Sequence, residues 1–336
     1  MTTEIKVPWY KDRHFQIPTA LICVLILFSS FVMIINHRFP VFFTLTPGSQ
    51  TVGADTGAPG NELTEGAVKK GLMTTDTMLV ISDDLFSNWL PNDKIWPTVL
   101  LDNPQNFQLG QLEMIRYTTR VMRDKLTRLR TTDRIDPDCD ATFTLLSNDP
   151  FKWVLPSAEN RFQGGTESLR RYRDRLAAGQ AEFYPRADNL NELLDQYVSL
   201  FGGINTRLAN APNRQRFKMS EEGAGEKDIN QPERLVDTKV PWTTIDDNFY
   251  YAQGAAYVLR QMMVAIKYDF AEILRVKNAA AQIDSIIEVL NQAQFEPLIV
   301  LNGDTGGLLA NHSMQLHSLL ENARQKIRNL NDMISQ

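Results

Sequence analysis

The hydrophobic and polar positions of the chain follow three different patterns. The first is a run from Ile17 to Ile35 that is almost wholly apolar and contains no charged residue. A helix rises about 1.5 Å per residue, so this run would extend roughly 28 Å, close to the hydrocarbon thickness of a bilayer. We therefore predict an N-terminal transmembrane helix over residues 17–37.

Two other interpretations explain this run less well. A buried core helix normally carries a polar stripe, whereas only Thr19, Cys23, Ser29 and Ser30 interrupt the apolar surface here. A cleaved signal peptide would have a shorter apolar run followed by a small-residue cleavage site, and no such site follows Ile35. A retained helix that contacts the lipid bilayer is the expectation that fits both observations.

The basic residues around this run predict its orientation. Three Lys or Arg residues precede it within residues 1–16, whereas Arg38 is the only one between the run and Lys69. Positive residues favour the cytoplasmic side of a membrane. We therefore expect residues 1–16 to form a cytoplasmic tail and the rest of the chain to lie outside the cytoplasm.

The second pattern covers residues 38–73, where Gly, Pro, Thr and Ser are frequent. Such a segment buries too little apolar surface to offset the entropy lost on ordering. We predict a flexible stalk over residues 38–73.

The third pattern places an apolar residue at every third or fourth position, which is typical of amphipathic helices. It predicts two helical halves, over residues 74–211 and 244–336. In the first half, residues 74–104 predict turns with one short helix capped by Ser82 or Asp83. Stripes and capping residues beyond that segment predict helices over 107–130, from Pro137, from Thr166 to Gly179 and from Asp188 to Gly202.

A polar segment separates the two halves. Between Pro212 and Pro241 the chain carries six basic and six acidic residues and few large apolar side chains. We interpret residues 212–243 as a mobile polar linker.

The second half has the most regular pattern in the chain. Apolar residues alternate at spacings of three and four from Phe249 to Ile273, and the pattern resumes as far as Leu290. One helix of roughly 45 Å or more is expected there, with another from Leu316 to Ile334. Such long antiparallel helices predict a mainly α fold, a helical bundle, although a seam of this spacing could also mediate self-association as in a coiled coil.

Composition narrows the class of protein. The chain has 336 residues, of which 43% are hydrophobic and 22% charged, values typical of a globular protein. A formal net charge of −5 argues against nucleic acid binding through bulk charge. Of the two cysteines, Cys23 lies in the apolar run, so only Cys139 could reach an oxidising compartment. No Cys/His cluster has metal-ligand spacing, and we expect no metal and no cofactor.

Several short phrases resemble an uncharacterised family of proteobacterial single-pass inner-membrane proteins, known only as a domain of unknown function. The resemblance extends over nearly the whole chain after the apolar run. It implies a protein of the Gram-negative envelope and implies no activity. The phrases are residues 83–86 (DDLF), 89–93 (WLPND), 108–110 (QLG), Trp153, 156–159 (PSAE), 183–190 (FYPRADNL), 297–303 (PLIVLNG) and 311–313 (NHS).

One flank of the first long predicted helix is basic. It carries Arg116, Arg120, Arg123 and Arg130. Guanidinium groups suit carboxylate or phosphate partners, so these residues are our candidate contact for an acidic protein, a lipid headgroup or a glycan phosphate. The alternative is a flank paired with acids of neighbouring helices, and the same two interpretations apply to the basic run within residues 170–175.

No catalytic residue is assigned from the sequence. Glu159 and Glu182 could act as the paired carboxylates of a glycan hydrolase. His312 and His317 are possible general bases, but five residues apart on a helix their side chains point about 140° away from each other. The segment 303–307 is rich in glycine but lacks the Lys and Ser/Thr of a phosphate-binding loop.

These patterns lead to one functional prediction and one alternative. We expect an inner-membrane protein with a periplasmic domain, an interaction or scaffold protein of the bacterial envelope that contacts an envelope partner through helical surfaces. It would be a component of a membrane-spanning assembly. The alternative is an envelope hydrolase that acts on peptidoglycan or another glycan.

Overall fold

The structure is a computed structural model that describes residues 13–36, 39–45, 52–54, 69–93, 102–130, 132–210, 215–217, 235–237, 245–297, 300 and 311–336. Its helices are α1 (Arg13–Asn36), α2 (Leu72–Ser87), α3 (Asp102–Val121), the π-helical turn η3 (Met122–Leu126), α4 (Pro137–Leu146), α5 (Ala158–Ala177), α6 (Ala187–Asn210), α7 (Ile245–Asp269), α8 (Ala271–Val276), α9 (Ala280–Gln292) and α10 (His312–Ser335). Two short antiparallel pairs of strands accompany them: β1 (Phe43–Leu45) with β2 (Val52–Ala54), and β3 (Gln215–Phe217) with β4 (Leu235–Asp237). The predicted mainly α fold is confirmed.

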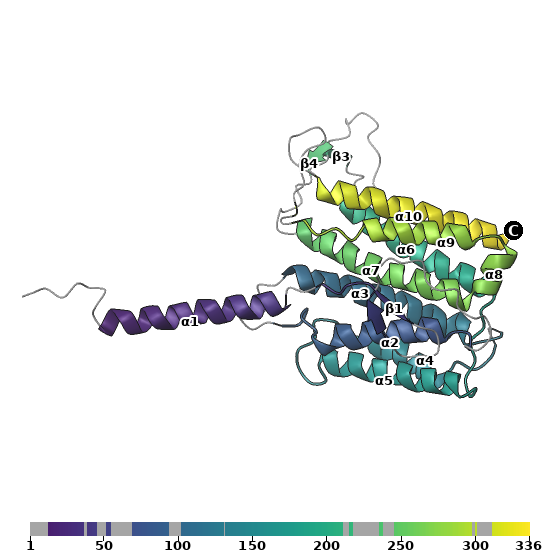
Figure 1. Cartoon of the computed structure of the whole chain (residues 1–336), viewed down its shortest axis with the longest axis horizontal. Helices are drawn as coiled ribbons and strands as arrows, with labels where there is room; N and C mark the ends of the chain where they lie inside the picture. Colours follow the sequence, from purple (N-terminus) through teal and green to yellow (C-terminus); the bar gives the residue numbers. More distant parts are fainter. Residues whose placement is uncertain are drawn as a thin grey trace, which may run out of the picture.

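The apolar run lies in α1, which projects from one end of a bundle formed by α2 to α10, while the C-terminus lies at the opposite end (Figure 1). In the described part of the chain, no helix has both the length and the apolar content needed to cross a membrane. Most of the predicted tail, residues 1–12, lies outside the described residues.

Helices α3 and α7 pack closely against each other, and two glycines make this possible. A Cβ atom at Gly110 of α3 would overlap the carbonyl oxygen of Tyr251, and one at Gly254 of α7 would overlap that of Phe107. The two backbones therefore touch where only glycine fits. Because α3 and α7 belong to the first and second predicted halves, the two halves share one core rather than forming separate units.

The long helix predicted from Phe249 to Leu290 is wrong. The chain leaves α7 at Asp269, forms the short α8, and reverses so that α9 packs back against α7. Asn278 causes the reversal: its φ of 51° lies in the left-handed region, which Asn tolerates better than most residues. The N–H groups of Asn278 and Ala279 donate to the carbonyls of Arg275 and Leu274, which closes α8 with a Schellman motif.

Other boundaries also differ from the prediction. Residues 72–87 form one long helix, α2, instead of turns with a short helix capped by Ser82 or Asp83. Helix α5 begins at Ala158, after a cap by Ser157, rather than at Thr166, because the Ser157 side chain accepts from the N–H of Asn160. The start of α4 at Pro137 is confirmed, with the Asp136 carboxylate accepting from two backbone N–H groups.

The first part of the predicted stalk packs against the bundle. Phe39 stacks on Tyr250 with a centroid distance of 5.3 Å, and Phe42 stacks on Tyr257 at 5.5 Å. Phe43 and Leu45 are buried in the common core. Residues 46–51 and 55–68 of the stalk, most of the predicted linker and most of the segment 298–307 lie outside the described residues.

Candidate functional site

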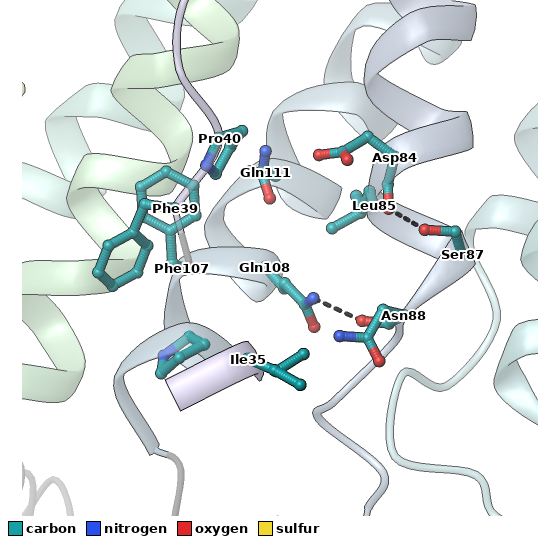
Figure 2. A pocket seen from close by; sticks show the side chains of 11 residues that line it. Ile35, Phe39, Pro40, Asp84, Leu85, Ser87, Asn88, Phe107, Gln108 and Gln111 are labelled. Carbon is teal, nitrogen blue, oxygen red and sulfur yellow. Dashed lines mark hydrogen bonds between the residues drawn. The ribbon is translucent and has the colours of Figure 1, made fainter. Parts of the chain in front are cut away.

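One hollow in the described structure lies where α1 meets the bundle (Figure 2). Its volume is about 180 Å³. Ile35 from the last turn of α1 lines one side, and Phe39 and Phe107 form an apolar wall. Asp84, at the C-terminal end of α2, lies across the hollow from Ile35. The site is therefore the junction between the apolar helix and the helical domain.

Most polar groups around this hollow already have partners. The Gln108 side chain accepts from the N–H of Leu90 at 2.8 Å and donates to the carbonyl of Asn88 at 2.7 Å. Ser87 donates to the backbone carbonyl of Asp84. Gln108 thus joins the start of α3 to the end of α2 and fixes the shape of the junction.

Asp84 is the acidic group of the junction. Its side chain is partly open to solvent, yet the neighbouring atoms remove enough hydration to raise the pKa of its carboxyl above the ordinary value of 3.8. Within the described part of the chain no Lys or Arg forms an ion pair with it. A single carboxylate in so small a hollow provides neither an acid–base pair nor the roughly 300–1,000 Å³ of a typical ligand pocket. We interpret the hollow as a structural junction.

The four arginines of the predicted anion contact fall into two pairs with different surroundings. Arg116 donates to the carbonyls of Leu146 and Asn148, at 2.8 and 2.6 Å, and so caps the C-terminal end of α4. Arg123 bonds Asp124 at 2.7 Å, and its guanidinium lies 4.1 Å from the centre of the Phe143 ring. Both side chains join α3 and η3 to α4.

The other two arginines of the predicted contact lie apart from this junction. Arg120 and Arg130 are exposed. The four residues therefore do not converge on one site, because two are used within the fold, and the proposed binding of an acidic partner stays a prediction.

The second basic run, on α5, is paired throughout. Arg173 forms an ion pair with Asp76 of α2 at 2.7 Å, and both side chains are largely buried. Arg170 pairs with Asp83 at 2.7 Å in a more exposed position. The remaining ion pairs are Arg171 with Asp138, and Arg175 with Asp136 and Asp138. These arginines hold α5 between α2 and α4.

The residues considered for catalysis are not brought together. Glu159 lies in the first turn of α5 and Glu182 follows its last turn, so roughly 30 Å of helix separates them. Paired carboxylates of glycoside hydrolases lie about 5–9.5 Å apart, which excludes this pair. His312 begins α10 beside Phe295, and Nδ1 of His317 is buried without a described hydrogen-bond partner. Asp304 lies outside the described residues.

Cys139 and the acidic residues are the remaining side chains that could bind a metal ion. Within the described residues no group of His, Cys, Asp and Glu side chains could hold a metal ion. Burial and the nearby Asp136 carboxylate raise the pKa of the Cys139 thiol well above its usual value, so it stays protonated and packs as a small apolar side chain.

One surface feature near the junction has no counterpart among the predicted sites. The loop between α4 and α5 exposes Phe151, Trp153, Val154 and Leu155, with 51%, 55%, 69% and 82% of their surface open. Its base is fixed to the segment that follows α2. The sequence indicates a loop here, because these side chains lie between Pro150 and Pro156 and lack helical spacing.

Comparisons with known proteins identify a family. The model of the family described as "Uncharacterized protein conserved in bacteria (DUF2333)" matches residues 16–336. No curated protein and no solved structure matches the chain. The resemblance to an uncharacterised bacterial family is thus confirmed, whereas its membrane location is not tested by the match.

Proposed function

We propose that this chain, which belongs to the DUF2333 family of proteins conserved in bacteria, is a membrane-anchored interaction protein of the cell envelope. In this proposal α1, whose uncharged run covers residues 17–35, inserts in the inner membrane, although no helix within the described residues alone meets the length and apolar content of a membrane span. The helical domain lies on the periplasmic side and binds an envelope protein there. The domain would thus present its surface to a partner at a fixed distance from the bilayer.

The observation that carries the proposal is the exposed apolar surface of α1. Eleven of its large apolar side chains, between Ile17 and Ile35, expose between 48% and 69% of their surface. Water-soluble monomers rarely expose apolar patches larger than a few hundred Å². A lipid environment would remove this surface from water, and the excess of basic residues before the apolar run favours a cytoplasmic N-terminus.

The junction supports an anchor that lies close to the domain. Ile35 at the end of α1 lines the hollow, and four residues later Phe39 stacks on Tyr250 of α7. Tyr257 of α7 donates to the carbonyl of Val41 at 3.2 Å. The chain that follows α1 is therefore held on the bundle within a few residues, which would keep the domain close to the membrane surface.

Membrane insertion is tested by fractionation of bacteria that express the full chain. We expect the protein to stay in the membrane pellet after carbonate extraction, and a variant that lacks residues 1–38 to be released. Alkaline phosphatase fused after Gln336 should be active, because this enzyme matures only outside the cytoplasm, whereas a fused fluorescent protein exported by the same route should stay dark. Release of the full chain by carbonate would overturn the anchor, and an inactive phosphatase would overturn the orientation.

The interaction is tested by crosslinking in the native host, purification through a C-terminal tag and mass spectrometry. The matched control replaces residues 17–35 with an unrelated transmembrane helix and leaves the domain unchanged. A stoichiometric envelope protein recovered with both forms would support binding through the helical domain. Recovery of the chain alone from both forms would contradict an interaction role.

A further inference from the structure

The loop between α4 and α5 presents an apolar tip on an ordered base. Trp89 Nε1 donates to the carbonyl of Pro150 at 2.9 Å, and Asn92 Nδ2 donates to the carbonyl of Lys152 at 3.2 Å. Within the loop, the N–H of Phe151 donates to the Asp149 carboxylate at 2.9 Å. These bonds hold the backbone, so the exposed side chains beyond it are presented outward by the fold.

Exposed apolar side chains are concentrated in this loop. Outside α1, the described residues include seven large apolar side chains that are exposed: Val41, Leu129, Phe151, Trp153, Val154, Leu155 and Val276. Four of the seven fall within residues 151–155. Scattered single residues need no explanation, whereas a contiguous group marks a contact surface.

The loop lies at the same end of the bundle as the exit of α1. Asn88 lines the junction hollow together with Ile35 of α1, and the next residue, Trp89, bonds the base of the loop. Asn92, slightly further along, bonds Lys152 in the loop itself. Figure 1 shows α1 leaving the bundle at the end opposite to the C-terminus. A bilayer that holds α1 would therefore face the side of the domain that carries the loop.

The geometry points to residues 151–155 as a second membrane contact, in which Trp153, Val154 and Leu155 enter the interfacial region of the bilayer beside α1. This inference rests on the proposed membrane anchor. Trp is enriched at the boundary between headgroups and acyl chains, where its ring is buried and its N–H stays hydrated. Lys152 can extend its ammonium group toward the phosphates while its methylenes lie along the apolar surface. Two points of attachment would restrict how the domain tilts on the membrane.

The experiment uses the full chain with Cys23→Ser, reconstituted in vesicles of phosphatidylethanolamine and phosphatidylglycerol. Cys139 is buried and is not expected to react with the label. A fluorescent NBD probe is attached to one new cysteine at a time: Val154→Cys in the loop, Ala177→Cys at the opposite end of α5, or Ile26→Cys in the middle of α1. Lipids that carry a nitroxide near the headgroup or deep in the acyl chain, and aqueous iodide, serve as quenchers.

We expect the Val154 label to be quenched several-fold more strongly by the shallow nitroxide than the Ala177 label, and to be protected from iodide. The Ile26 label should respond to the deep nitroxide. If the Val154 label behaves like the Ala177 label while the Ile26 label is quenched, the loop contact is overturned and the anchor stands. If the Ile26 label is open to iodide, the anchor itself fails and the inference fails with it. Protection of the Val154 label that appears only in native membranes would replace the lipid by a protein partner.

Discussion

Helices α1 and α10 have the same length, 24 residues, but α10 buries its apolar side chains whereas α1 exposes most of its own. In α10 the stripe that contains Leu320 and Ile327 is fully buried against the other helices. In α1, Leu21 and Leu27 expose 63% and 69% of their surface. The sequence of α10 is therefore explained by packing within the chain. The sequence of α1 is not explained in this way, and this difference is the reason for proposing that α1 lies in lipid.

The comparison is tested most strongly by shortening one leucine in each helix. Leu320→Ala should lower the free energy of unfolding by about 2–5 kcal/mol, because it leaves a cavity in the core. Leu27→Ala, the matched change in α1, should alter it by less than about 0.5 kcal/mol. Chemical denaturation of the full chain in detergent measures both values. Similar losses in the two variants would mean that α1 packs on the bundle.

Helix α5 allows the same contrast between a buried and an exposed position, because it carries one ion pair of each kind. Arg173→Ala should lower the free energy of unfolding by about 2 kcal/mol, because it leaves the buried carboxylate of Asp76 without its ion-pair partner. Loss of a fully buried pair costs about 3–5 kcal/mol. The smaller value is expected here because part of the Arg173 site is open to water. The control is Arg170→Ala, whose pair with Asp83 is about half exposed and should contribute less than about 1 kcal/mol. Equal effects in denaturation experiments would contradict a structural role for the buried pair.

Two glycines in bundle helices should respond with opposite sign. Gly254→Ala would push α7 away from the Phe107 carbonyl and should destabilise the domain by about 1–3 kcal/mol. Gly203→Ala in α6 meets no atom within 4 Å and should stabilise it by about 0.5–1 kcal/mol, because alanine favours a helix. Shifts of the melting temperature check both signs. An unchanged melting temperature for Gly254→Ala would mean that α3 and α7 do not pack this closely.

The smallest expected effect is a dependence on pH. The buried carboxylate of Asp269 accepts from the N–H groups of Gly71 and Thr74, at 2.8 and 2.7 Å, and so caps α2. Desolvation outweighs these bonds and raises its pKa above the ordinary value of 3.8. Between the two values the native state keeps a proton that the unfolded chain has released. The free energy of unfolding should therefore fall as pH rises through this interval.

The variant Asp269→Asn isolates this contribution from those of the other acids. The difference in unfolding free energy between the original chain and the variant should shrink as pH rises above 3.8 and then become constant. Denaturation series at several pH values provide the comparison. A difference that grows with pH would show that the hydrogen bonds, rather than burial, control the pKa.

Part of the structure follows from local sequence signals. Spacings of three and four predict α10 and the core stripe of α3, because a helical face repeats every 3.6 residues. Asp136 followed by Pro137 predicts the start of α4, since the cap and the fixed φ of proline act within one turn. The apolar run likewise predicts a helix at α1, whatever surrounds it.

The tertiary structure decided the remainder, because periodicity indicates helical segments and not the direction of the chain. The stripe from Phe249 to Leu290 kept its spacing through the reversal at Asn278, so one predicted helix became three. The role of an arginine depends on a partner far away in the sequence, as the bond from Arg116 to Leu146 illustrates. The position of the exposed loop beside α1 also depends on distant residues, because Trp89 and Asn92 hold it through hydrogen bonds that local sequence patterns do not predict.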